Sequence, residues 1–231
     1  VMNMLNNGTI DGFIVAIAEE TQSLKDYKHF KDIINSGTPI VMFDRVTDAI
    51  NCDKVVVDDF DSAFDATSHL IQLGSKKIAL LSTIHNLSVG KLRFKGYQKA
   101  LSDANLPIDE KLILLETSLE EFDAKLQKLI ASKNMDAIFA LDEHSATAAM
   151  KMALKQGINI PEELNIIGFA DGVWSRRLTP SLSTVSQHAP EIGTKAAELL
   201  INKLNTKDEF YQHQTVVIKT ELRQRESTRK L

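Results

Sequence analysis

The sequence predicts an α/β protein in which helices flank parallel β-sheets. Short apolar runs alternate with amphipathic helical patterns over most of the chain, which is typical of strand–helix–strand units. Some runs, such as residues 78–81 and 137–141, are continuously apolar, as expected of strands buried on both faces. Glycine or proline follows several helical patterns and ends them. Together these observations predict parallel strands joined by right-handed crossovers.

The composition indicates a globular protein and argues against several partners. The chain has 231 residues, 43% hydrophobic and 25% charged, enough for a large core. Its net charge is −4 and its basic residues are dispersed, so we expect no DNA-binding face within this segment. The longest apolar runs are far shorter than the roughly 20 residues of a membrane span. A single cysteine, Cys52, excludes an internal disulfide and any multi-cysteine metal site, which fits a reducing compartment.

The elements follow from apolar periodicity and from capping signals. The expected strands are residues 10–16, 40–43, 55–57, 77–82, 111–115, 136–141, 164–169 and 215–222. The expected helices are residues 27–35, 58–73, 89–105, 118–132, 145–156 and 190–204. Gly74 and Gly157 end two of the helices, and Ser118 with Glu121 forms a capping box that begins another.

The two ends of the chain carry separate expectations. Residues 1–7 have the pattern of the end of a helix already under way, so we expect the chain to be cut from a longer protein. Residues 223–231 form a charged tail, in which we expect Arg225, Arg229 and Lys230 to be exposed to solvent.

The stretch of residues 163–187, ELNIIGFADGVWSRRLTPSLSTVSQ, is the most informative part of the chain. Its apolar strand stops at a small, polar and aromatic cluster that contains Asp171 and Trp174. Ligands of open parallel sheets lie at the carboxyl ends of the strands, so both side chains are candidate ligand contacts. The alternative is structural, with Asp171 capping the next turn and Trp174 filling the core.

Three further residues occupy comparable positions. Asp44 and Asp142 directly follow expected strands, and Arg93 lies in the first turns of an expected helix. An arginine offers a planar fork of donors that suits adjacent hydroxyls or a carboxylate. The structural alternatives are a turn-forming Asp44 and a solvated Arg93.

Motifs in one order along the chain resemble the effector domain of the lactose-repressor and galactose-repressor family of transcription regulators. The most specific is TPSLSTVSQ at residues 179–187. The others are VMFDR (41–45), VVVDD (55–59) with ATSHL (66–70), RFKGY (93–97), DAIFA (136–140) and REST (225–228). The resemblance therefore covers nearly the whole chain.

The resemblance implies a two-lobed fold similar to a periplasmic binding protein, with parallel sheets, flanking helices and a ligand cleft between the lobes. We expect residues 1–57 and 187–210 to form the first lobe, and residues 58–186 and 211–231 to form the second. The chain would cross between them near residues 57–58, 184–187 and 210–214. The family's opening strand and helix, its hinge and its DNA-binding helix-turn-helix would precede Val1, so the first lobe is expected to be incomplete.

The resemblance also implies a function. The ligand would be a small polar effector, most simply a sugar or sugar derivative, held by Asp44, Arg93, Asp142, Asp171 and Trp174. The family usually has asparagine at the position of Asp142; a carboxylate only accepts hydrogen bonds, which favours a ligand rich in donors. The intact protein would be a cytoplasmic homodimer that binds DNA only through its missing head and does not bind membranes. The resemblance specifies neither the effector nor the direction of its effect.

The sequence gives little support to other classes of function. It contains no phosphate-binding glycine loop and no G-x-S-x-G elbow, so we expect no catalytic residue and no cofactor. Asp58, Asp59 and Asp61 complement a helix dipole and are not expected to bind a metal. Among the scattered histidines, His69 is expected to be packed. The alternative function is a periplasmic sugar-binding protein of a transport system, which shares the fold and the cleft.

Overall fold

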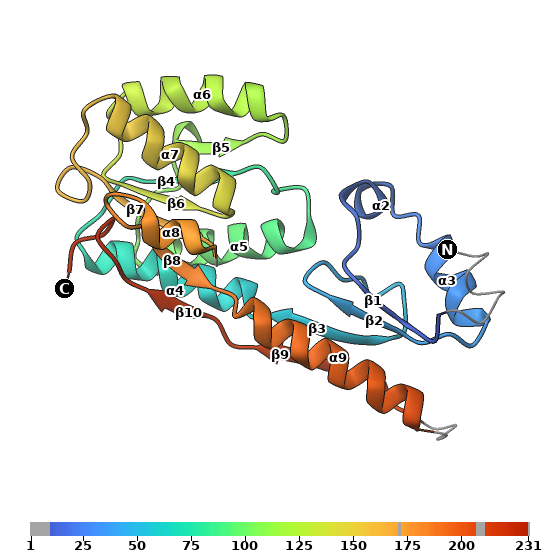
Figure 1. The fold of residues 1–231 in the computed structure, drawn as a ribbon. Helices are drawn as coiled ribbons and strands as arrows, with labels where there is room; N and C mark the ends of the chain where they lie inside the picture. Colours follow the sequence, from blue (N-terminus) through green and yellow to red (C-terminus); the bar gives the residue numbers. More distant parts are fainter. Residues whose placement is uncertain (1–9, 171, 207–210, 231) are drawn as a thin grey trace. The chain divides into compact units, whose positions relative to one another are not determined.

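The computed structural model describes residues 10–170, 172–206 and 211–230, and the chain forms two compact units within it (Figure 1). The first unit contains Val1–Val57 and His188–Lys219, and the second contains Asp58–Gln187 and Thr220–Leu231. The helix end expected at residues 1–7 lies outside the described residues. Each unit is an α/β layer structure, as the sequence predicts.

The first unit is built on a parallel sheet in the order β1-β2-β3-β9. Its strands are β1 (Phe13–Val15), β2 (Ile40–Phe43), β3 (Asp53–Val57) and β9 (Thr215–Ile218), and its helices are α2 (Glu19–Leu24), α3 (Lys28–Asn35) and α9 (Ala189–Asn205). Alternate residues of β2 serve two cores. Ile40 and Met42 pack with Phe30 of α3, whereas Val41 packs with residues of α9. The strand is therefore continuously apolar because both of its faces are covered.

The second unit is built on a sheet in the order β10-β8-β7-β6-β4-β5, in which only the β10–β8 pair is antiparallel. Its strands are β4 (Ile78–Ser82), β5 (Ile113–Leu115), β6 (Ala137–Ala140), β7 (Asn165–Phe169), β8 (Ser183–Ser186) and β10 (Glu221–Arg223). Its helices are α4 (Asp59–Gln72), α5 (Ser88–Asp103), the 3₁₀ turn η1 (Glu110–Leu112), α6 (Leu119–Ala131), α7 (Glu143–Lys155) and α8 (Val173–Arg177).

Two helical layers cover the second sheet. Figure 1 shows α6 and α7 over one face and α4 and α5 over the other. Residues of β4 alternate between the layers: Leu81 packs with α6 and α7, and Leu80 packs with α4 and α5. Helices α4 and α5 approach closely because α5 carries Gly96, where a β-carbon would lie 2.3 Å from the Phe60 carbonyl oxygen.

Most expected elements are present with ends shifted by a few residues, and the exceptions are informative. The strand expected at residues 215–222 is two strands, because β9 pairs with β3 of the first unit and β10 pairs with β8 of the second. The third crossing between units therefore lies at Lys219–Thr220, not at residues 210–214, and the second lies at Gln187–His188. Helices α2 and α8 and strand β8 were not expected.

The C-terminal residues also differ from the expectation of a solvent-exposed tail. Ser227 and Thr228 are buried, and the Ser227 hydroxyl donates to the Ile166 carbonyl oxygen at 2.6 Å. Arg225 is half-buried, and its Nη1 donates to the Leu182 carbonyl oxygen at 2.6 Å, so the expectation of a solvated Arg225 is wrong. The side chain of Arg229 is exposed but donates to the Glu162 carbonyl oxygen. The segment is fastened across β7 and β8 by polar contacts, which leave no apolar pattern in the sequence.

Candidate ligand-binding site

The carboxyl ends of three neighbouring strands meet at one edge of the second sheet. Strands β4, β6 and β7 are adjacent and parallel, so the residues that follow them lie at the same edge. Thr83 follows β4 after Ser82, Asp142 follows β6 after Leu141, and Ala170 follows β7. We call this the strand-end edge of the second unit.

Asp142 is already surrounded by hydrogen-bond donors. Its carboxylate caps α7 by accepting from the Ser145 backbone N at 2.8 Å and from the Ser145 hydroxyl. It also accepts from the Thr83 backbone N at 2.9 Å and from the Thr83 hydroxyl at 3.1 Å. A carboxylate has about four acceptor positions, and these donors occupy them. Asp142 therefore ties β4 to the start of α7 in this structure.

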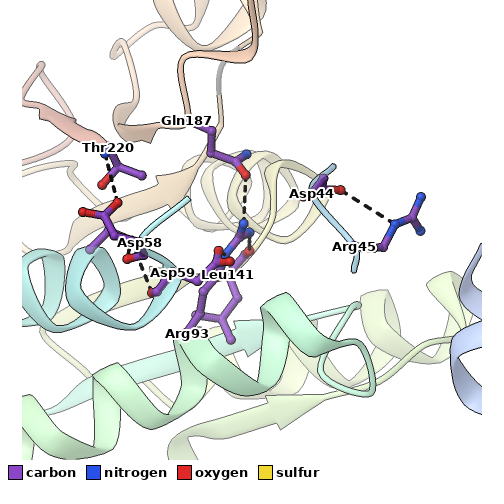
Figure 2. Close-up of polar contacts among 9 residues, drawn as sticks. Asp44, Arg45, Asp58, Asp59, Arg93, Leu141, Gln187 and Thr220 are labelled. Carbon is purple, nitrogen blue, oxygen red and sulfur yellow. Dashed lines mark hydrogen bonds and ion pairs between the residues drawn. The ribbon is translucent and has the colours of Figure 1, made fainter. Parts of the chain in front are cut away.

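Arg93 is buried at the same edge, with 3% of its surface exposed. Its Nε donates to Asp59 Oδ1 at 2.7 Å, its Nη1 to the Leu141 carbonyl oxygen at 2.7 Å, and its Nη2 to Gln187 Oε1 at 2.9 Å (Figure 2). The guanidinium also lies 3.8 Å from the centre of the Phe169 ring. The expectation of a solvated arginine is wrong, because each nitrogen of this fork has a partner inside the second unit.

Asp58 makes a related contact at the start of the second unit. Its Oδ1 accepts a hydrogen bond from the backbone N of Thr220 at 2.9 Å (Figure 2). Asp58 follows the first crossing of the chain, and Thr220 follows the last. The aspartates at the start of α4 thus have structural partners. Within the described residues, no group of three or more His, Cys, Asp or Glu side chains is arranged to hold a metal ion.

Trp174 lies on α8, directly after β7, and 65% of it is exposed. The expected alternative, that it fills the core, is therefore wrong. The turn before it is held by the Ser175 hydroxyl, which donates to the Gly172 carbonyl oxygen at 2.8 Å. A β-carbon at Gly172 would lie 2.3 Å from Glu143 Oε1, so the Glu143 side chain at the start of α7 lies against this glycine. Asp171 itself lies outside the described residues.

Asp44 belongs to the first unit, where it follows β2. Its backbone has a φ of 55°, and its N donates to the Val55 carbonyl oxygen at 3.0 Å. The side chain is 37% exposed, and Oδ2 lies 3.7 Å from Arg45 Nε. This left-handed conformation is one that aspartate tolerates in turns, so the turn-forming expectation is supported.

The structure thus brings Arg93, Asp142 and Trp174 to the carboxyl ends of neighbouring strands of one unit, while Asp44 follows a strand of the other. Sequence reasoning missed Asp59, Gln187 and Phe169 as partners of Arg93. Gln187 is the last residue of the TPSLSTVSQ motif, and its place in this motif is the sequence signal that could have pointed to it. His69, expected to be packed, is half-buried, and burial lowers the pKa of its imidazole.

Comparisons with known proteins define the class. The family model described as "periplasmic binding protein-like domain" matches residues 67–228, and the chain belongs to this family. The chain is 32% identical over 194 residues to the HTH-type transcriptional regulator DegA of Bacillus subtilis (strain 168), covering 84% of this chain and 57% of that protein. It is 30% identical over 235 residues to the HTH-type transcriptional repressor PurR of Haemophilus influenzae (strain PittEE), covering 100% of this chain and 68% of that repressor.

Solved structures agree with these relatives. A regulatory protein of the LacI family from Chloroflexus aggregans is 27% identical with a TM-score of 0.83, covering 98% of this chain and 80% of that one. A LacI family regulator from Enterococcus faecium, with bound ribose, is 23% identical with a TM-score of 0.84, covering 98% and 82%, and shares the fold. The chain is the effector-binding domain of a LacI-type transcriptional regulator. The alternative of a transport protein finds no support among these relatives.

Proposed function

We propose that the chain senses a small polar ligand, a sugar or sugar derivative, and controls DNA binding by a helix-turn-helix segment outside residues 1–231. The observation that carries the proposal is the meeting of Arg93 and Asp142 at the strand-end edge, beside an exposed Trp174. Guanidinium and carboxylate groups satisfy hydroxyls, while an indole face stacks on the C–H surface of a sugar. A solved relative is described with bound ribose, which supports this class of ligand.

Asp171 and Asp44 complete the proposed set of ligand contacts. Both are acids directly after apolar strands, and the half-exposed Asp44 retains acceptor capacity toward solvent. We further propose that the intact protein is a cytoplasmic homodimer without catalytic activity. The ligand shifts its DNA affinity only to the extent that it binds one conformation more tightly than another. Within the described residues, no helix has both the length and the apolar character that a membrane crossing requires.

Trp174 provides a direct test because it is the single tryptophan of the chain. We would titrate the domain with monosaccharides, disaccharides, sugar phosphates and nucleobases while recording tryptophan emission and melting temperature. A ligand that covers the exposed indole changes its emission. At about 100 times its dissociation constant it adds nearly 3 kcal/mol to the free energy of unfolding.

Matched substitutions separate the site from the rest of the surface. Asp171→Asn should weaken binding of the ligand identified in this way by about tenfold or more, the effect of one hydrogen bond to a charged group. Asp103→Asn makes the same change at an exposed aspartate near the end of α5 and should leave binding unchanged. A ligand bound equally by both variants would remove Asp171 from the site. Recovery of the ligand chemically unchanged, by mass spectrometry, tests the absence of catalysis.

A further inference from the structure

The chain crosses between its two units three times, and each crossing is anchored inside the second unit. The crossings are Val57–Asp58, Gln187–His188 and Lys219–Thr220. Asp59 and Gln187 are held by Arg93, and the backbone N of Thr220 is held by Asp58. The contacts join segments far apart in the sequence: Arg93 and Asp59 are 34 positions apart, and Arg93 and Gln187 are 94 positions apart.

Arg93 also contacts the strand-end edge. Its Nη1 bonds the carbonyl oxygen of Leu141, the residue before Asp142, and its guanidinium covers the ring of Phe169 at the end of β7. One buried group therefore touches both the proposed ligand edge and two of the three crossing segments (Figure 2). A guanidinium is planar, and its donors point in fixed directions, so a new acceptor changes the geometry of the existing bonds.

The two crossing contacts differ in strength. The Arg93–Asp59 bond joins opposite charges that are 4% and 3% exposed, whereas Gln187 offers a neutral amide oxygen from a half-buried side chain. Both bonds are charge-assisted through the guanidinium, but only the bond to Asp59 also gains the attraction of an opposite charge. The Gln187 contact is therefore the one that yields when another acceptor reaches Nη2.

We propose that Arg93 is a positioning residue that couples the strand-end edge to the crossing segments. It fastens Gln187 and Asp59, and an effector oxygen that accepts from Nη2 replaces Gln187 Oε1 and loosens the second crossing. The step in which an effector oxygen replaces Gln187 rests on the proposed function, whereas the fastening of Gln187 and Asp59 by Arg93 does not. The effector thus acts on the chain segment that links the units, beyond simply filling a site.

Hydrogen–deuterium exchange of the ligand-free chain tests the fastening. Gln187→Ala removes the acceptor, and we expect amides of residues 186–189 to exchange about tenfold faster, the value of one hydrogen bond to a charged group. Residues 58–60 should also exchange faster, because the same guanidinium holds Asp59. Gln187→Glu keeps an acceptor and should restore slow exchange in both segments.

Gln156→Ala is the matched control. It removes a glutamine whose Nε2 donates to the Gln127 carbonyl oxygen on the exposed surface of the same unit, and it should leave both crossings unchanged. If Gln187→Ala behaves like this control, or if residues 58–60 do not respond, the coupling through Arg93 is overturned. Asp59→Asn provides a second perturbation from the opposite side of the guanidinium and should speed exchange at residues 186–189.

The replacement step is tested by repeating the exchange measurement with saturating D-ribose, monitored through Trp174 emission. Bound ribose should speed exchange at residues 186–189 in the native sequence but add nothing in Gln187→Ala. Ribose that changes the emission but not the exchange overturns the replacement. If neither ribose nor any other ligand of the panel changes the emission, the proposed function fails, while the result for the ligand-free chain still decides the fastening.

Discussion

Two aspartates occupy equivalent positions in the sequence and very different surroundings in the structure. Asp142 follows β6 in the second unit, where backbone and hydroxyl donors from Thr83 and Ser145 enclose its carboxylate. Asp44 follows β2 in the first unit, where its half-exposed carboxylate has a 3.7 Å contact with the neighbouring Arg45. In the sequence, each aspartate directly follows an apolar strand. This pattern alone does not distinguish a helix-capping aspartate from one that contacts a ligand.

The difference lies in the donors that the fold supplies. A carboxylate whose acceptor positions are filled by its own chain stabilises that chain, and a ligand must first displace a donor. A carboxylate that faces solvent loses only water when a ligand arrives. By this criterion Asp44 can accept from a ligand without losing an internal hydrogen bond, whereas Asp142 must first give up one of its present donors.

The largest expected effect of a substitution on this edge is at Arg93. Arg93→Ala leaves the buried Asp59 carboxylate without its guanidinium partner, and breaking a buried ion pair costs about 3–5 kcal/mol of unfolding free energy. Urea unfolding followed by circular dichroism measures the loss. Lys99→Ala, on the same helix, removes an exposed pair with Asp103 and should cost about 0.5 kcal/mol or less. Equal losses in the two variants would show that the Arg93 pair contributes no more than a surface contact.

A smaller effect tests the comparison of the two aspartates directly. Asp142→Ala removes the cap of α7 and the partner of Thr83, so we expect a loss of about 1–3 kcal/mol. Asp44→Asn, which keeps a residue that tolerates the left-handed backbone, should change the unfolding free energy by about 0.5 kcal/mol or less, because the side chain is half-exposed. Equal and large losses would mean that Asp44 is also structural, and the comparison would fail.

Local sequence signals predicted those parts of the fold that depend on neighbouring residues. Ser118 caps α6 as expected, with its hydroxyl accepting from the Glu121 backbone N, but its own backbone N donates to Glu116 and not to Glu121 as in a full capping box. The strand at residues 40–43 has the expected bounds. Both follow from patterns within a few residues. The division of residues 215–222 does not, because β9 and β10 pair with strands of different sheets.

The polar contacts of the site were beyond sequence reasoning for a similar reason. Arg93 was placed correctly in the first turns of a helix, but its three hydrogen-bond partners lie on segments distant in the chain. Ser227 and Thr228 are buried although both are polar, so no hydrophobic periodicity in the sequence marks this segment as buried. Tertiary hydrogen bonds between polar side chains leave little trace in a single sequence.

His69 extends the comparison to a half-buried side chain with an unsatisfied polar atom. Its Nε2 has no hydrogen-bond partner within the described part of the chain, and burial lowers the pKa of the imidazole from 6.5. Below about pH 6.5 the unfolded chain therefore binds a proton more readily than the folded chain, so the folded state loses stability as the pH falls. We expect His69→Gln to lose less stability than the native sequence between pH 7 and about pH 5.5, measured by urea unfolding. An equal loss of stability in His69→Gln and in the native sequence over this range would show that the burial of this imidazole does not contribute to the pH dependence.

The smallest effect on stability is expected at Trp174, where the test concerns binding. Trp174→Ala should change the unfolding free energy by about 0.5 kcal/mol or less, because the indole is largely exposed on a short helix. Stacking of an aromatic ring contributes about 0.5–1.5 kcal/mol, so calorimetry with the identified ligand should show binding weakened about threefold to tenfold. Leu119→Ala, at an exposed apolar residue at the start of α6, should leave affinity unchanged. Equal affinity in both variants would mean that the exposed indole serves another contact, and the ligand edge would then rest on its acids and Arg93.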